Sequence, residues 1–316
     1  MNRTTRRWAA GLLLWALGAA GCGKPPPPAP KEPARASVSG AAALEEVRRL
    51  VELGPRDAGT PGAERAATYL LQRLRDVGVE AEIQEFQEAS PLGLTTFRNV
   101  LGRIPGTGDR IVLLGSHYDT KAGIEGFEGA NDSGSSSGLL IELARVLKQN
   151  GPHSPEIRFA FFDGEECQVA YKPGDGFHGS RHLAKTMAAD GSLPAVAAMI
   201  LLDMVGDRDL TITMPRNGTP WLTALAFEAA RAEGVRQQFG LHPGMISDDH
   251  TAFLNRGVPA IDLIDFEFGS APGKNDYWHT AEDSMDKLSA ESLEAVGRVA
   301  ARMVEALAQG RAPAEK

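Results

Sequence analysis

The stretch 156-EIRFAFFDGEE-166 decides the fold, because it leads from a buried strand directly into a cluster of acids. Residues 159–162 are apolar on both faces, which is typical of a central strand covered by helices on either side. Asp163, Glu165 and Glu166 follow where this strand leaves the core. A solvated loop between a strand and a helix would also explain these acids, since burial of an unpaired carboxylate is costly. The rest of the chain decides between the two interpretations.

Helical and extended patterns alternate on both sides of this strand. Apolar residues at helical spacing predict helices at 41–53, 63–78, 138–149, 222–234 and 291–309. Apolar or alternating runs predict strands at 79–87, 97–106, 110–120, 156–166, 196–206 and 258–265. This alternation is typical of a single α/β domain whose largely parallel central sheet is flanked by helices.

The composition of the 316-residue chain is that of an ordinary globular protein, with a net charge of −8. A chain of this length can bury the core of one large α/β domain. The acidic balance argues against nucleic acid as a partner, because phosphate binding needs a basic face. Cys22 and Cys167 are the only cysteines, so no disulfide framework is implied.

The N-terminal segment has the pattern of an export signal. Basic residues within 3–7 precede an apolar run over residues 8–20, which is too short to span a membrane and matches a signal-peptide core. Small residues at 19–21 then precede Cys22, as in the cleavage box of bacterial lipoproteins, whose cysteine is lipidated. We therefore expect a cell-envelope lipoprotein anchored through Cys22, or a secreted or periplasmic protein if cleavage occurs without lipidation.

A proline-rich spacer separates this signal from the predicted domain. Residues 23–40 contain the run KPPPPAPKEP, which favours an extended and semi-rigid conformation. The predicted organisation is therefore a signal peptide with a lipoprotein box at 1–22, a linker at 23–40 and a single folded domain at 41–312. No internal repeat or second linker follows, and we expect a monomer whose only membrane contact is the lipid anchor.

Acids and histidines recur at the predicted carboxyl ends of the strands, where ligands bind in such sheets. They are His117, Asp119, Asp132, Glu165, Glu166, Asp203, Asp248, Asp249, His250 and His279. Each has an ordinary explanation alone, since Asp132 could cap a helix and Asp203 could pair with an arginine. Together they would crowd carboxylates at one rim, which a divalent cation would relieve. Histidine and carboxylate ligands without cysteine favour zinc, and one of the adjacent glutamates would remain free as a general base or acid.

Six motifs in order resemble those of the zinc-dependent aminopeptidase and glutaminyl cyclase superfamily. They are HYDTK from 117, GANDSGSSSGLLIELAR from 129, FFDGEE from 161, LLDMVG from 201, DDHTAFLNRGVP from 248 and WHTAEDSMDKL from 278. The resemblance covers about Leu44 to Leu307 and implies one α/β domain with a twisted, mixed sheet that carries zinc at the strand ends. It also implies that Asp132, Glu166 and His279 bind zinc and that Glu165 is the general acid/base.

The superfamily has two enzymatic branches, and the ligand positions leave both open. Aminopeptidases of this superfamily hold a second zinc ion through the positions that match His117, Asp132 and Asp203, all of which are filled here. We therefore expect one zinc ion if the chain is a cyclase and two if it is an aminopeptidase.

Residues around the predicted pocket are similar to the cyclase branch. Trp278 directly precedes His279, as does the tryptophan that walls the cyclase pocket. The segment DDH, which begins at Asp248 and follows Ile246 and Ser247, is similar to the cyclase segment EDDH. Tyr171 takes the place of the cyclase aromatic at the pocket mouth. The resemblance thus implies that Trp278, Ile246 and Tyr171 contact the substrate.

The expected activity is that of a glutaminyl-peptide cyclotransferase, an acyltransferase that converts the N-terminal glutamine of peptides or proteins to pyroglutamate and releases ammonia. Glu165 would move the proton, and by resemblance Asp203 and Asp248 would hold Glu165 and the intermediate in an acid network. The rival enzyme is a two-zinc aminopeptidase that releases N-terminal residues. The third alternative is a surface lipoprotein that binds peptides without catalysis on the same fold.

Overall fold

The computed structural model describes residues 35–310. The predicted signal peptide, Cys22, most of the linker and residues 311 and 312 of the predicted domain lie outside these residues, so those predictions stay untested. Among the described residues, no helix combines the length and the apolar character that a membrane span requires.

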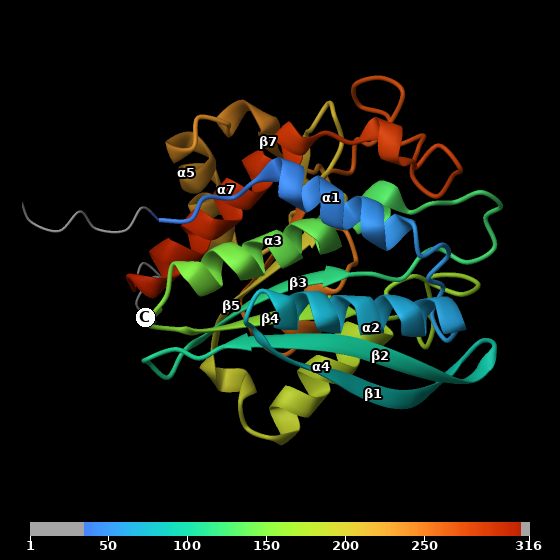
Figure 1. The fold of residues 1–316 in the computed structure, drawn as a ribbon, viewed down its shortest axis with the longest axis horizontal. Coiled ribbons are helices and arrows are strands. Elements are labelled where there is room, and N and C mark those ends of the chain that lie inside the picture. The colour runs from blue at the N-terminus through green and yellow to red at the C-terminus, as the bar shows by residue number, and fades with distance from the viewer. Residues whose placement is uncertain (1–34, 311–316) are drawn as a thin grey trace, which may run out of the picture. The chain divides into compact units, whose positions relative to one another are not determined.

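A six-stranded mixed sheet forms the centre of the domain (Figure 1). Its strands, in spatial order, are β1 (Glu80–Ser90), β2 (Gly93–Ile104), β4 (Glu156–Phe162), β3 (Ile111–His117), β5 (Val196–Asp203) and β8 (Ala260–Ile264). Strands β4, β3, β5 and β8 are mutually parallel, whereas β2 is antiparallel to both of its neighbours, β1 and β4. The expected single α/β domain with a mixed, largely parallel sheet is therefore confirmed.

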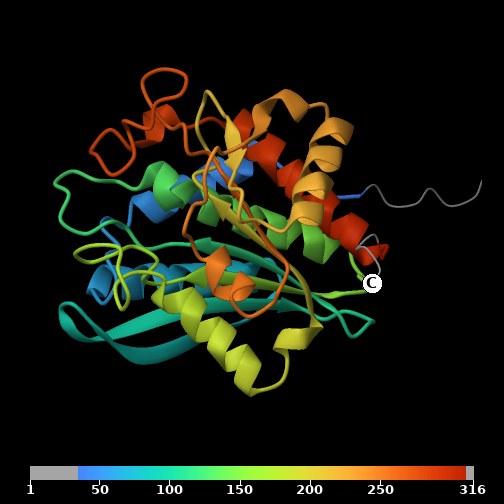
Figure 2. The same cartoon turned by 180° about the vertical axis from the view of Figure 1, so that it is seen from behind.

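Helices cover both faces of this sheet, as Figures 1 and 2 show from opposite sides. The helices on one side are α1 (Gly40–Val51), α2 (Pro61–Asp76), α3 (Ser136–Gln149), α5 (Pro220–Ala232) and α7 (Ala290–Ala308). Helix α1 packs mainly on α3 and α7. The other face packs against α4 (His178–Ala189) and α6 (His250–Leu254). Because both faces are covered, the central strands β3, β4 and β5 are almost wholly buried.

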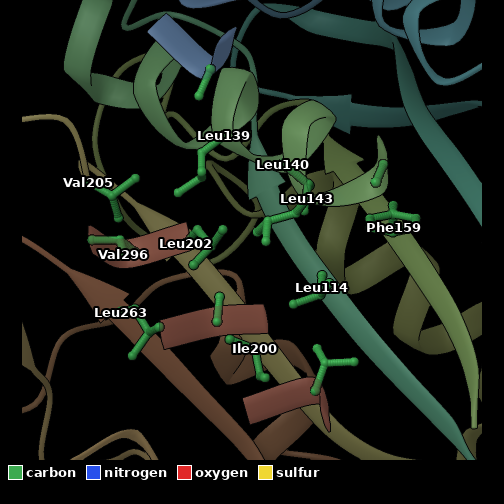
Figure 3. Packing of buried hydrophobic residues seen from close by; sticks show 14 of the residues in the cluster. Leu114, Leu139, Leu140, Leu143, Phe159, Ile200, Leu202, Val205, Leu263 and Val296 are labelled. Carbon is green, nitrogen blue, oxygen red and sulfur yellow. The ribbon is translucent and has the colours of Figure 1, made fainter. Parts of the chain in front are cut away.

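The larger core lies between the sheet and α3. Leu114 of β3, Ile200 of β5 and the α3 residues Leu139 and Leu140 belong to one cluster of buried apolar side chains (Figure 3). Full burial of such a side chain stabilises the fold by about 1.5–3 kcal/mol. This packing fixes α3 against the strands that carry the acids and histidines.

Helix α1 crosses α3 at a glycine, which allows the two backbones to approach closely. A Cβ atom at Gly138 would lie 2.5 Å from Cγ2 of Val47 and 2.8 Å from the carbonyl oxygen of Ala43. Any larger residue would therefore push α1 away from α3.

Several short elements were not predicted from the sequence. They are α4, the parallel pair β6 (Ile212–Met214) and β7 (Phe239–Leu241), the π-helical turn η1 (Ala130–Ser135) and the 3₁₀ turns η2 (Leu193–Ala195), η3 (Arg236–Gln238) and η4 (Met285–Lys287). Most span a single turn or three residues, which is too short for a periodic pattern to emerge. Helix α4 is long enough for such a pattern, but no element was predicted for its residues.

Candidate active site

The carboxyl ends of the parallel strands bring the predicted acids and histidines to one rim. His117 and Asp203 are the last residues of β3 and β5, and Glu165 and Glu166 follow the end of β4. Asp132 comes from η1 and His279 from the loop before η4. Segments that lie far apart in the sequence thus converge as the fold class requires.

Five of these residues form two adjoining clusters that could hold metal ions. The ligand atoms of Asp132, Glu166 and His279 lie within 4.8 Å of one another, and so do those of His117, Asp132 and Asp203. Asp132 belongs to both clusters. Its Oδ1 atom lies 3.0 Å from Nε2 of His117, and its Oδ2 atom lies 3.3 Å from Nε2 of His279.

The donor set of these clusters fits zinc. Both ring nitrogens of His117 and the Oδ1 atom of Asp203 are buried and form no hydrogen bond among the described residues. Buried polar atoms are nearly always satisfied, so atoms that converge without hydrogen bonds are typical of ligands for a cation. Nitrogen and carboxylate ligands without cysteine match the catalytic zinc sites of proteins.

The pKa values of the two histidines indicate the same demand for positive charge. Burial alone would lower the pKa of His117, but the carboxylates of Asp119, Asp132 and Asp203 outweigh burial and raise it well above its usual value. Burial likewise opposes the protonation of His279, yet Asp132 and Glu166 raise its pKa to about 9. The rim therefore favours a cation, whether a proton or a metal ion.

Two further acids hold the backbone of the ligand segments. The carboxylate of Asp119 accepts the backbone N–H groups of Glu165 at 3.2 Å and Glu166 at 3.1 Å. The carboxylate of Asp283 likewise accepts two backbone N–H groups, that of Asp132 at 3.0 Å and that of Asn131 at 2.7 Å. Sequence reasoning placed Asp119 among the rim acids without this role and overlooked Asp283, although the quoted motif WHTAEDSMDKL contains it.

The two adjacent glutamates both accept from the hydroxyl of Tyr171, Glu165 at 3.4 Å and Glu166 at 2.8 Å, but their other surroundings differ. Oε1 of Glu166 lies 2.9 Å from Nε2 of His279, and its Oε2 accepts the hydroxyl of Tyr171 at 2.8 Å. Glu165 instead lines the neighbouring cavity. Burial, together with nearby carboxylates such as that of Glu166, raises the pKa of Glu165 well above its usual value. A buried carboxyl of this kind is suited to accept and return a proton.

A cavity of about 240 Å³ opens beside Glu165 and has largely apolar walls. It is lined by Asp132, Glu165, Tyr171, Phe177, Asp203, Ile246, Ser247, Asp248, Ile264, Phe266 and Trp278. The ring of Trp278 stacks on the imidazole of His279 at a centroid distance of 4.0 Å and meets Phe266 edge-on at 5.3 Å. The structure therefore brings together every site residue that the sequence predicted, and it adds Phe177, Ile264 and Phe266, for which no motif gave a signal.

A buried acid network lies behind this cavity. Asp248 and Asp262 are buried with oxygens that form no hydrogen bond among the described residues. Burial, with neighbouring carboxylates, raises the pKa of both groups well above the usual value for aspartate. Asp262 was not predicted as a site residue, although an acid within the apolar run 258–265 is unusual enough to indicate one.

His250 packs against this network but stays neutral. Its Nε2 atom lies 3.1 Å from the side-chain nitrogen of Asn217, which can only donate, so Nε2 accepts. Burial lowers the pKa of His250 to about 4. His250 forms a third possible metal cluster with Asp248 and Asp262.

Backbone strain concentrates next to the site. Only three described residues other than glycine have a positive φ angle, namely Phe177 (54°), Met204 (50°) and His279 (55°). Phe177 lines the cavity, Met204 follows Asp203, and His279 is a candidate ligand. Left-handed backbone at bulky residues is uncommon and tends to occur at functional sites. The strain therefore supports this rim as the functional centre.

The fold and the rim define an α/β domain with a candidate metal-binding site at the strand ends. Residues 99–304 match the profile of Peptidase family M28, and the chain belongs to this family.

Named relatives refine this assignment. The chain is 31% identical to glutaminyl-peptide cyclotransferase of Drosophila melanogaster over 73% of this chain and 71% of the relative. A solved glutaminyl cyclase from an Acidobacteriales bacterium matches at 35% identity and a TM-score of 0.83, covering 90% of this chain and 99% of that one. A solved Zn-dependent exopeptidase from Parabacteroides distasonis matches at 27% identity and a TM-score of 0.76, covering 86% and 99%. The predicted superfamily is confirmed.

Proposed function

We propose that this protein is a glutaminyl-peptide cyclotransferase, which converts the N-terminal glutamine of peptides or proteins to pyroglutamate and releases ammonia. The names of its relatives support this activity. The observation that carries the proposal is a small, largely apolar cavity in which Glu165 lies next to Asp132, with Trp278 stacked on His279. Such a cavity suits one short side chain and excludes water, which would otherwise compete as the nucleophile.

The proposed metal is one zinc ion, held by Asp132, Glu166 and His279. When bound, it would act as a Lewis acid on the γ-carboxamide carbonyl of the substrate. Tyr171 supports this arrangement, because its hydroxyl engages one oxygen of Glu166 and leaves the oxygen that faces His279 available. The Zn-dependent exopeptidase among the structural relatives also favours zinc.

Glu165 is proposed to move the proton. The α-amine of the substrate forms a bond to its own γ-carbonyl carbon, and the bond from that carbon to the amide nitrogen breaks. Glu165 takes a proton from the attacking amine and delivers it to the departing ammonia. Because nucleophile and carbonyl belong to one residue, proximity supplies much of the acceleration. Asp203 and Asp248 line the same cavity and would keep protons close to Glu165.

The second candidate is a two-zinc aminopeptidase, favoured by one observation. His117, Asp132 and Asp203 also converge, so the chain has ligands for a second ion. An assay with Gln-initiated and Leu-initiated chromogenic peptides, with and without a chelator, distinguishes the two enzymes. Chelator-sensitive ammonia release from the Gln peptide alone supports the cyclotransferase. Release of leucine with no ammonia would overturn that assignment in favour of the peptidase.

We also propose export as a monomeric lipoprotein anchored through Cys22. The support is the basic and apolar pattern of residues 1–21 directly before this cysteine. Replacement of Cys22 by Ala should release the protein from the membrane fraction, as detected by immunoblotting. A wild-type protein already found in the soluble fraction would contradict the anchor.

A further inference from the structure

A second cleft of about 360 Å³ adjoins the catalytic cavity. The two spaces share three lining residues, Tyr171, Phe177 and Ser247. A ligand that fills the cavity and extends outward past Tyr171 therefore enters this second cleft. A glutamine at the N-terminus of a peptide extends in this way, since only its carbonyl group connects it to the following residues.

The second cleft has a cationic lining. Lys172, from the loop after β4, Arg181 of α4 and Arg256, which follows α6, all line it, and no acid does. None of the three forms an ion pair within 4.0 Å in the part of the chain that the structure describes. Arg181 lies 3.4 Å from Nδ1 of His178, and Arg256 donates to the carbonyl of Ala252. Three segments thus bring unpaired cations together.

This lining contrasts with the rest of the molecule. The chain has a net charge of −8, and the adjoining rim is crowded with carboxylates. Charges that serve only solubility need not converge on a concave surface, whereas a cleft lined by charges of one sign concentrates ligands of the opposite sign. The contrast indicates a ligand with negative charge.

We propose that this cationic cleft, lined by Lys172, Arg181 and Arg256, binds the residues that directly follow the N-terminal glutamine and selects peptides with Asp or Glu there. The proposal rests on the proposed cyclotransferase activity and names its substrate class. An extended chain advances about 3.4 Å per residue, so the second and third residues would lie closest to the shared wall. Their carboxylates would pair with the cations, and lysine at the same positions would be repelled.

The test compares three C-terminally amidated peptides, Gln-Glu-Glu-Ala, Gln-Ala-Ala-Ala and Gln-Lys-Lys-Ala, by ammonia release. Two partly exposed ion pairs should give the acidic peptide a kcat/KM about tenfold higher than the basic peptide at about 0.05 M salt. The ratio should shrink at about 0.5 M salt, because salt screens such pairs. The neutral peptide should fall between the two.

Variants locate the preference in the cleft. The triple variant K172Q/R181Q/R256Q should lower the acidic-to-basic ratio to about one, while K172R/R181K/R256K should retain it. The control is R110Q, because Arg110 is exposed, forms no ion pair among the described residues and precedes β3 at the end opposite His117. It should retain the wild-type ratio.

The outcomes separate this inference from the activity on which it rests. Equal kcat/KM values for all three peptides would overturn the proposed role of the cationic cleft, and so would an acidic-to-basic ratio that does not change with salt. Either result would leave the proposed cyclotransferase activity standing. No ammonia from any peptide would instead overturn the proposed function, and the cleft proposal with it. A preference that survives in K172Q/R181Q/R256Q would also contradict the assignment to this cleft.

Discussion

The backbone between Phe162 and Glu166 shows how single residues set the chemistry. Gly164 adopts a φ angle of 71°, and a Cβ atom there would lie 2.5 Å from Cε1 of Phe97. This tight turn presents the next two amide groups to the carboxylate of Asp119. One glutamate can then face His279 while its neighbour lines the cavity, so adjacent residues of the same type perform different tasks.

Replacement of Glu165 by Gln tests the proposed proton transfer. We expect kcat to fall by about a hundredfold to ten-thousandfold, because the amide cannot accept a proton. Zinc content should stay unchanged, since Glu165 belongs to neither ligand cluster. Steady-state ammonia release and metal analysis measure both quantities. E52Q, at an exposed position after α1, is the control and should behave as wild type. An E165Q enzyme within threefold of wild type would refute the role.

His250 should make stability depend on pH. Burial lowers its pKa from 6.5 to about 4. Burial also raises the pKa of Asp262, whose Oδ2 atom lies 3.9 Å from Nδ1 of His250. Between these pH values the unfolded chain binds a proton that the folded chain does not, so stability falls as pH falls.

The comparison with H250Q isolates this effect from other titrating groups. Relative to H250Q, the free energy of unfolding of the wild type should decrease by about 3 kcal/mol from pH 6.5 to 4. Urea titrations monitored by circular dichroism at several pH values measure it. Parallel pH curves for the two proteins would show that His250 is charged when folded.

Much of the candidate site could be predicted because its residues combine unusual chemistry with strand ends. An acid after an apolar run, as at Glu165 or Asp203, is conspicuous in a sequence. Phe266 and Phe177 gave no such signal, since an aromatic residue in a loop is compatible with many environments. Their contribution depends on tertiary contacts that only the folded chain defines.

At the level of elements, long periodic segments were predicted well and sheet order was not. The helices α3 and α7 and the strands β4 and β5 lie close to their expected positions. The antiparallel arrangement of β2 was missed, although β1 and β2 follow each other with only two residues between them. Two strands without a helix between them indicate a hairpin, because a parallel connection needs a crossover.

The crossing of α1 and α3 gives a prediction about packing. Alanine normally favours a helix over glycine by up to about 1 kcal/mol. At Gly138 the contacts with Val47 and Ala43 should outweigh this gain, so G138A should lower the free energy of unfolding by about 1–3 kcal/mol.

Urea unfolding of G138A measures the change. The matched control is G240A, because a Cβ at Gly240 meets only one atom, at 3.8 Å, and Gly240 has no positive φ. It should stay within about 0.5 kcal/mol of wild type. A G138A protein as stable as wild type would show that α1 shifts without cost.

At the scale of the whole molecule, the rim should link metal binding to stability. The carboxylates that converge there repel one another, and an ion that binds only the folded chain stabilises it by mass action. We expect zinc at a hundredfold excess over its Kd to stabilise the protein by about 3 kcal/mol relative to chelated protein.

Thermal unfolding with a chelator and then with added zinc measures this effect, and metal analysis should find about one zinc per chain. The control is D132A/H279A, which removes two proposed ligands and should show no zinc-dependent shift in Tm. An unchanged wild-type Tm after chelation and zinc addition would contradict a metal that binds at this rim.

The two oxygens of Asp132, each facing a different histidine, have an evolutionary consequence. Because Asp132 belongs to both ligand clusters, a single substitution near His117 could add or remove the second ion while the fold stays intact. Few substitutions would then separate the ring-closing activity of a cyclotransferase from the hydrolytic activity of an aminopeptidase. Laboratory selection for one activity from a parent with the other should therefore accumulate changes around His117 and the aromatic wall, and spare the hydrophobic interior.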